Sequence, residues 1–276
     1  MGIIKTSFYH LVAFLIILLL FNVAFNLGFI PFTGYALKDN LNSSEGKVKI
    51  ANWNLQIFGD AKSAKQDIID FYISSMKNYD IIFIQEIRDF DESSFQYLCS
   101  FFEDYSCLIS SRAGRTTSKE QYGIIYKKYI DITLTDYNPD QLERWERPPI
   151  KAEIKIKNYT INVYNIHTKT TDVLKELAYL EDLVENNGNV MILGDLNADC
   201  DYYNAEKETQ FDSWYWIVSD ESDTTISSRS CAYDRIILNE NAFKEYSSRG
   251  IQSEGITPEI SDHYMIWVEL NTKDKE

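Results

Sequence analysis

Apolar, strand-like segments of this chain repeatedly end in a polar residue. Residues 190–193, "VMIL", are an uninterrupted apolar run, typical of a strand covered on both faces, and Gly194, Asp195 and Asn197 follow it. Gly, Asp and Asn are also common turn formers, so one such end is explained by a turn. Other strand-like segments carry at their ends Asn54, Glu86, His167, Asp234, and the neighbours Asp262 and His263. Because so many ends supply only carboxylate, amide or imidazole groups, we expect a functional site where the strands end.

Stretches with helical spacing separate these strands, at residues 63–76, 92–102 and 172–185. In the last of them Leu174, Leu177 and Leu180 recur every three residues and predict a buried face. Residues 151–168 indicate a hairpin that turns at Lys157 and Asn158. Strands joined both by hairpins and by helical crossovers predict an α/β fold with mixed sheets, although the pattern leaves the strand order open.

The N-terminal 36 residues differ from the rest of the chain. They contain no acidic residue and, apart from Lys5, no lysine or arginine, and they end in the small-x-Ala sequence 34–36. This layout predicts a signal peptide. A membrane anchor is the alternative, because residues 7–32 carry no charged side chain and a spanning helix needs about 20 apolar residues. We assign residues 37–47 to a polar linker and residues 48–272 to the catalytic domain.

Charge and cysteine content narrow the class of protein. The net charge of −15 excludes a broadly basic nucleic-acid binder, but it permits an enzyme that contacts a few phosphates with the help of cations. All four cysteines lie after residue 36, at Cys99, Cys107, Cys200 and Cys231. Both N-terminal interpretations place the domain outside the cytosol, where two disulfides would persist. Three pairings are compatible with the sequence, and four buried free thiols are the alternative.

The polar ends suit metal-assisted attack on a phosphoester. Carboxylate and amide oxygens bind hard cations such as Mg²⁺, Mn²⁺ or Ca²⁺, and a histidine paired with a carboxylate serves as a base or an acid near neutral pH. Zinc is disfavoured, because the chain has three histidines, one of them inside residues 1–36, and neither a CxxC nor an HExxH motif.

At these motifs the chain resembles the endonuclease/exonuclease/phosphatase superfamily and, within it, the deoxyribonuclease I branch. The resemblance covers about residues 48–271. It rests on the ordered stretches "KIANWNLQIFGDAK", "YDIIFIQEIRD", "GRTTSKEQY", "ERPPI", "NIHT", "VMILGDLNADC", "DTTISSRSCAYDRIIL" and "SDHYMIWVEL". It implies a four-layer sandwich of two packed mixed β-sheets flanked by helices.

The resemblance also implies roles for individual residues. Two histidine–carboxylate pairs, His263 with Asp234 and His167 with Glu120, would flank the scissile phosphate as base and acid. Asp195 would help to hold the phosphate, the attacking water or a second ion. The remaining implied residues are Asn197 beside Asp195, the metal ligands Glu86 and Asp262 with Asn54 close by, Arg147 on a phosphate, and Arg88 in the DNA minor groove.

The chain departs from the family pattern at two loops. The family's "GRxxYKE" loop has a tyrosine that stacks in the minor groove, where this chain has Ser118. A calcium-like loop persists through Asp223 and Thr225, but Arg229 replaces an oxygen ligand. The family bridges the cysteines that correspond to Cys200 and Cys231, so we expect this disulfide; whether Cys99 and Cys107 pair is left open.

We therefore expect an extracellular, monomeric endonuclease that requires Mg²⁺ or Mn²⁺, with Ca²⁺ as a further structural ion, and that hydrolyses DNA phosphodiester bonds with low sequence specificity. It would be secreted, or attached to the outer face of the membrane through its N-terminal segment. Two alternatives stay open. One is a phosphatase or phospholipase-like phosphoesterase of the same fold, and the other is a catalytically silent surface-binding domain.

Overall fold

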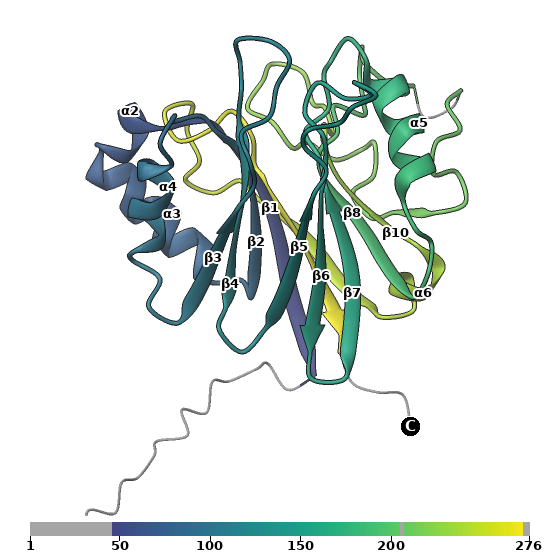
Figure 1. Ribbon diagram of the computed structural model, residues 1–276, viewed down its shortest axis with the longest axis horizontal. Coiled ribbons are helices and arrows are strands. Elements are labelled where there is room, and N and C mark those ends of the chain that lie inside the picture. The colour runs from purple at the N-terminus through teal and green to yellow at the C-terminus, as the bar shows by residue number, and fades with distance from the viewer. Residues whose placement is uncertain (1–45, 205–206, 273–276) are drawn as a thin grey trace, which may run out of the picture. The chain divides into compact units, whose positions relative to one another are not determined.

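A computed structural model describes residues 46–204 and 207–272, which form two six-stranded β-sheets with helices on their outer faces (Figure 1). The first sheet has the order β11-β12-β1-β2-β4-β3 and the second the order β5-β6-β7-β8-β10-β9. The first contains β1 (Lys47–Phe58), β2 (Ile81–Ile87), β3 (Tyr105–Ile109), β4 (Gln121–Lys127), β11 (Tyr246–Gln252) and β12 (Met265–Asn271). The second contains β5 (Asp131–Asp136), β6 (Ile150–Ile156), β7 (Tyr159–Asn165), β8 (Asn189–Asp195), β9 (Tyr215–Trp216) and β10 (Asp234–Leu238). The helices are α2 (Asp60–Ser63), α3 (Gln66–Met76), α4 (Ser93–Cys99), α5 (Val173–Leu183) and α6 (Glu240–Phe243).

The expected signal peptide or anchor, residues 1–36, and most of the expected linker lie outside the described residues. Lys47, which we assigned to the linker, is instead the first residue of β1 and pairs with Asn271 of β12. Among the residues that the structure describes, no helix is long and apolar enough to cross a membrane.

Both sheets are mixed, as the sequence predicts. In each, one pair of neighbouring strands is parallel, β1 with β2 and β7 with β8, and the other pairs are antiparallel. A parallel pair needs a crossover connection, and α3 and α5 lie in these two crossovers. The carboxyl ends of two neighbouring parallel strands lie at the same edge of a sheet, and the polar residues lie at this edge.

Three apolar layers hold this arrangement together. The largest lies between the two sheets and includes Ile50, Phe83 and Val163. A second, with Ala51 and Trp53, packs against the helices that precede and follow β2, and a third covers the other sheet beneath α5. Ile50 and Ala51 belong to different layers because side chains of a strand alternate between its faces. Both faces are covered, so the strands are continuous apolar runs.

Helix α5 buries a slightly different face from the expected one. Leu177 and Leu180 are fully buried, but Leu174 is 39% exposed, and its neighbour Val173 occupies the buried position. Glu176 is also buried, and its carboxylate accepts hydrogen bonds from the backbone N–H groups of Glu146 and Lys169. The face therefore turns toward Val173, because the helix must present Glu176 to these donors.

All four cysteines are paired. Cys200 bonds to Cys231, the pairing that the family resemblance implies, and closes the connection from the end of β8 to the start of β10. Cys99 bonds to Cys107 and joins the end of α4 to β3. This second disulfide settles the question that the sequence left open.

Candidate active site

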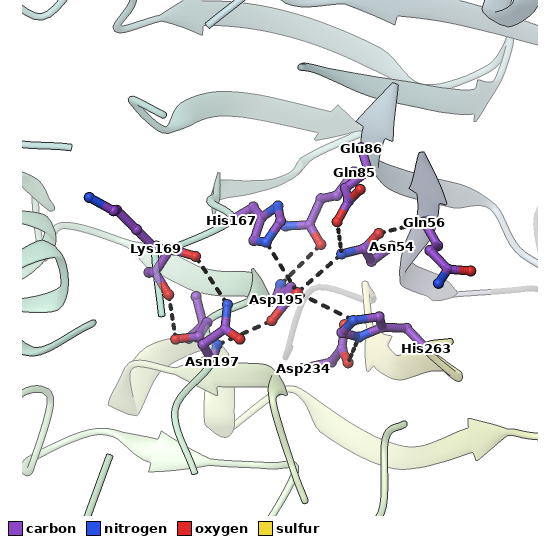
Figure 2. A network of polar contacts seen from close by, with 12 residues as sticks. Asn54, Gln56, Gln85, Glu86, His167, Lys169, Asp195, Asn197, Asp234 and His263 are labelled. Atoms are coloured by element: carbon purple, nitrogen blue, oxygen red, sulfur yellow. Dashed lines mark hydrogen bonds and ion pairs between the residues drawn. The ribbon is translucent and has the colours of Figure 1, made fainter. Parts of the chain in front are cut away.

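The polar residues meet at the edge of the sandwich where both parallel strand pairs end (Figure 2). Asn54 and Glu86 lie on β1 and β2 of the first sheet, and Asp195 ends β8 of the second. His167 follows β7, and His263 precedes β12 across the interface between the sheets. The structure brings these five strand-end positions, which are distant in sequence, close together.

Asp195 lies at the centre of the cluster. Its Oδ2 accepts a hydrogen bond from Asn54 Nδ2 at 3.1 Å. The same oxygen is 3.3 Å from His167 Nε2 and 3.6 Å from His263 Nε2. Figure 2 shows the two imidazole rings on either side of this carboxylate. Two ring nitrogens from different sheets thus face one small volume.

Each histidine is oriented by a second carboxylate behind it. His167 Nδ1 is 2.7 Å from Glu120 Oε1, and His263 Nδ1 is 2.8 Å from Asp234 Oδ2. Glu120 and Asp234 are buried, with 1% and 0% of their surface exposed. A hydrogen bond at Nδ1 fixes the ring orientation and the tautomer, and this directs Nε2 of both rings toward Asp195.

The carboxylates also set the charge of the two rings. Burial favours the neutral form of His263, but the negative charges of Asp234 and Asp195 outweigh it and raise its pKa to about 10. Burial acts in the same way on His167, where Glu120 and Asp195 raise the pKa despite the opposing charge of Arg147. Both rings therefore retain protons readily at neutral pH.

Glu86 is an acid whose ionised form is favoured in the fold. Its burial opposes the charged form, but the charges of His167 and Arg88 lower its pKa to about 2. The backbone N–H of Ile57 donates to Glu86 Oε2 at 3.0 Å, and Asn54 Nδ2 donates to Oε1 at 3.3 Å. Glu86 is thus a fixed anionic oxygen donor beside Asn54 and Asp195.

Asp262 completes the oxygen-rich side of the cluster. Its buried Oδ1 has no hydrogen-bond partner and lies 3.8 Å from His263 Nε2. Lys62 lies near the charges of Asp262 and Glu86, and desolvation by burial lowers its pKa to about 8 although both carboxylates oppose this. A carboxylate oxygen without a partner is the type of ligand that a hard divalent cation binds.

Within the described residues, two groups of three side chains each lie close enough together to bind one ion. One is Glu86, Glu120 and His167, and the other is Asp195, Asp234 and His263. Asp262, expected to bind the catalytic metal, and Asp223, expected to bind calcium, belong to neither group. The loop of Asp223 and Thr225 is closed locally, with Thr225 N donating to Asp223 Oδ1 at 3.4 Å, and Thr225 forms a β-bridge with His263. The structure thus links this loop to the site through its backbone.

The two arginines expected to contact DNA are held by protein groups. Arg147 is buried, and its Nε and Nη2 donate to the backbone carbonyl oxygens of His167 and Thr168 at 3.0 and 2.9 Å. Arg88 Nη2 donates to Glu86 Oε2 at 3.0 Å and lies 3.3 Å from Glu120 Oε2. Arg147 therefore positions the segment that carries His167, whereas Arg88 is 21% exposed at its side chain and lies at the surface of the cluster.

Asn197 also turns inward. Its backbone lies in the left-handed region with φ 47°, its N–H donates to Asp195 Oδ1 at 3.2 Å, and its Nδ2 donates to Thr168 O at 3.0 Å. Left-handed backbone outside glycine is uncommon and gathers at functional sites. Gln56, Ile57 and Glu86 share this feature in the same cluster.

Sequence patterns did not point to a set of buried amides that lies next to the cluster. Gln85 Oε1 accepts from Asp195 N at 3.0 Å and from Asn52 Nδ2 at 3.2 Å, and Gln85 Nε2 donates to Ile166 O at 2.7 Å. Asn165 Nδ2 donates to Asn52 Oδ1 at 2.9 Å. These amides are fully buried and connect the two sheets beside Asp195 through Gln85, Asn52 and Asn165. A lone amide inside an apolar run, as in "IIFIQE", is the sequence pattern that could have indicated a buried, hydrogen-bonded glutamine.

A second missed contact set holds His263. Trp53 Nε1 donates to the carbonyl oxygen of His263 at 2.9 Å. Ser261 Oγ accepts from His263 N at 3.0 Å and donates to Asn54 O at 2.6 Å. His263 is therefore tied by its backbone to β1, the strand that carries Asn54.

The sequence of this chain is similar to a family model and to several known proteins. A model of the Endonuclease/Exonuclease/phosphatase family matches residues 22–263. Deoxyribonuclease-1 of Gallus gallus is 30% identical over 262 residues, covering 82% of this chain and 93% of that protein. Deoxyribonuclease-1-like 1 of Mus musculus is 30% identical over 252 residues, covering 81% of this chain and 80% of that protein.

Solved structures share the fold at lower identity. A Leptotrichia buccalis protein of the endonuclease/exonuclease/phosphatase family aligns with a TM-score of 0.60 and 17% identity, covering 81% of this chain and 99% of that one. TDP2 of D. rerio, complexed with single strand DNA product, aligns with a TM-score of 0.60 and 15% identity, covering 82% of this chain and 99% of that one. The four-layer sandwich expected from the sequence is therefore confirmed.

Proposed function

Since the chain belongs to the endonuclease/exonuclease/phosphatase family and is a hydrolase of phosphodiester bonds, we propose that it is an exported, divalent-cation-dependent endonuclease that cleaves DNA with low sequence specificity. One observation carries the proposal. The Nε2 atoms of His167 and His263, each backed by a buried carboxylate, approach the same oxygen of Asp195 within 3.6 Å. Hydrolysis of a phosphodiester needs two proton transfers on opposite sides of one phosphorus atom, and this geometry supplies two groups that can perform them.

In the mechanism the two rings have complementary roles. One imidazole, in its neutral form, accepts a proton from water as the water oxygen attacks phosphorus; a divalent cation bound at the neighbouring carboxylates would favour this neutral form by opposing their negative charge. The other ring donates a proton to the leaving oxygen as its bond to phosphorus breaks. Glu120 and Asp234 hold the rings in place and stabilise the positive charge on each. Asp195 and Asn197 orient the water and the phosphate between the two rings.

Mg²⁺ or Mn²⁺ fits the oxygen donors of the site. Glu86 and Asp262 would hold the ion, with Asn54 adjacent, since Glu86 is ionised and Asp262 Oδ1 is unpartnered. A divalent ion held there would neutralise phosphate charge and stabilise the leaving oxygen. The loop of Asp223 and Thr225 is the proposed position of a structural Ca²⁺.

The similarity to proteins named Deoxyribonuclease-1 supports DNA as the substrate. The exposed part of Arg88 is the proposed contact to the DNA minor groove, and Arg147 would act on the phosphate through the His167 segment that it holds. Two disulfides support an oxidising location, so we propose that the protein is secreted, or attached to the outer membrane face through residues 1–36, and acts as a monomer.

A plasmid-nicking assay tests the proposal. Wild-type protein should nick supercoiled DNA with Mg²⁺ or Mn²⁺, and EDTA should abolish nicking. His263→Ala should lower the rate about 10²–10⁴-fold, because it removes a positioned acid or base. Lys128→Ala, a surface change near β4, is the control and should match wild type. Hydrolysis of sphingomyelin or inositol phosphates without DNA cleavage would contradict a nuclease and favour another phosphoesterase.

A further inference from the structure

The side chain of Lys62 joins two segments of the candidate active site beyond the point where their strands are paired. Its ammonium Nζ donates to Leu55 O at 2.7 Å and to Ile260 O at 2.8 Å. Leu55 directly follows Asn54, and Ile260 lies two residues before Asp262. Lys62 itself lies on α2, the short helix that follows β1, and is half-buried. One lysine thus bridges two site segments that are far apart in the sequence.

The register of the sheet explains why a side chain is needed there. The antiparallel ladder between β1 and β12 ends at the pair of Asn52 and Ile266. The parallel ladder between β1 and β2 shifts its register between Asn54 and Phe58. A bulge removes ladder hydrogen bonds from the residues inside it, so their carbonyl groups need other donors. The lysine supplies one and ties the bulge to the loop that precedes β12.

Two further side chains hold the same loop. Ser261 Oγ donates to Asn54 O at 2.6 Å, and Tyr72 OH donates to Ile260 O at 2.6 Å. The carbonyl oxygen of Ile260 therefore accepts from both a phenol and an ammonium group, and a charged donor forms the stronger hydrogen bond. These bonds fix the backbone that leads to His263.

A lysine of a nuclease can instead contact the substrate directly, so the partners of this side chain matter. Both hydrogen bonds of Lys62 Nζ go to backbone oxygens of the protein. The negative charges of Asp262 and Glu86 attract the same ammonium group. An ammonium has three N–H donors, and the protein uses two of them here. This pattern fits a group that holds other residues better than it fits a contact to a phosphate.

We propose that Lys62 is a positioning residue for hydrolysis. By holding the end of β1 to the loop before β12, it fixes Asn54 and Asp262 relative to the ring of His263. The inference rests on the proposed function, because it concerns residues of that site. A misplacement of about 1 Å in a catalytic group lowers the rate on the order of a hundredfold. Loss of Lys62 should therefore lower kcat much more than it raises KM.

The test compares two lysines on two substrates, plasmid DNA and the small diester bis(p-nitrophenyl) phosphate. Lys62→Met should lower kcat about a hundredfold on both substrates and change KM by less than about threefold. Lys62→Arg keeps a cation with several N–H donors and should restore kcat to within about tenfold of wild type. Lys65→Met removes the same charge at an exposed lysine three residues away and is the matched control, with kcat like wild type. Circular dichroism selects a temperature at which each variant is folded. If Lys62→Met does not fold, the shorter and uncharged Lys62→Gln takes its place.

The small diester separates positioning from a direct contact to DNA. A rise in KM on DNA alone, with normal turnover of the small diester, would overturn the positioning role and identify a phosphate contact. An unchanged kcat in folded Lys62→Met, or an equal loss in Lys65→Met, would also overturn it. If wild type hydrolysed the small diester but not DNA, the proposed nuclease would be wrong, whereas a hundredfold loss in Lys62→Met on the diester would still support positioning. A wild-type protein that hydrolyses neither substrate would overturn the proposed function and this inference together.

Discussion

Replacement of Gln85 by leucine tests whether the buried amides beneath Asp195 hold the site together. The side chain is fully buried and joins the two sheets through hydrogen bonds to Asp195 N, Asn52 Nδ2 and Ile166 O. Leucine has a similar size but can make none of them. The change therefore leaves two donors and one acceptor without partners in the interior.

The expected loss follows from these three groups. A buried polar group that loses its partner costs about 1–3 kcal/mol, and the apolar leucine offsets part of this sum. We expect Gln85→Leu to lower the free energy of unfolding by about 3–6 kcal/mol. Because Asp195 and the His167 segment lose a shared anchor, the nicking rate of folded protein should also fall on the order of a hundredfold.

Urea unfolding followed by circular dichroism measures the stability, and plasmid nicking at a temperature where the variant is folded measures the rate. Gln96→Leu, at an exposed glutamine of α4, is the matched control and should change stability by about 0.5 kcal/mol or less. If Gln85→Leu lost less than about 1 kcal/mol, the three hydrogen bonds would not be the connection between the sheets that the distances indicate.

Three further predictions follow from individual features of the structure. A Cβ added at Gly194 would lie 2.0 Å from a backbone carbonyl oxygen, so Gly194→Ala should lower the free energy of unfolding by about 3 kcal/mol or more, measured by thermal unfolding. Gly188 has open space around it, so Gly188→Ala should cost about 1 kcal/mol. Equal costs would refute the clash. Double serine substitution of Cys200 and Cys231 should lower the free energy of unfolding by roughly 3.5–4 kcal/mol, and that of Cys99 and Cys107 by roughly 2.5 kcal/mol. The first disulfide stabilises more because it closes a loop of 31 residues rather than 8. The reverse order in urea unfolding would contradict this reasoning. The pKa of His263 in the fold, about 10, exceeds its ordinary value. In EDTA its contribution to the free energy of unfolding should therefore be complete below about pH 6.5 and be lost as the pH rises toward 10. The free energy of unfolding should fall by at most about 1.4 kcal/mol per pH unit from this group. His263→Asn should flatten this slope, and an unchanged slope would show that the ring is not charged in the fold.

Much of the site could be predicted from local sequence patterns. The apolar run before Asp195 identifies a covered strand, and the order of the motifs around Asn54, Glu86, His167 and His263 identifies the family. These features are local, because strand periodicity reflects only which faces of a segment are covered. The same logic predicted the hairpin at Lys157, where the structure pairs the residues on both sides of a two-residue turn.

Other features depend on contacts between distant segments. The periodicity of α5 predicted Leu174 at the buried face, but the need to satisfy Glu176 selected Val173 instead. The family resemblance at "ERPPI" implies that Arg147 contacts a phosphate, but no local pattern shows that its guanidinium donates to the carbonyl oxygens of the His167 segment. Each outcome was decided by a partner far away in the sequence.

Local sequence patterns are enough to identify the residue types of the site, the strands that carry them and the family. The position of Asp195 between the two imidazole rings, and its hydrogen bond to Gln85, follow instead from how the two sheets pack. Hydrophobic burial acts on each segment through its own pattern, whereas a hydrogen bond or an ion pair requires a specific partner at about 3 Å. Which partner reaches that distance depends on the order of strands in two sheets and on the packing between them.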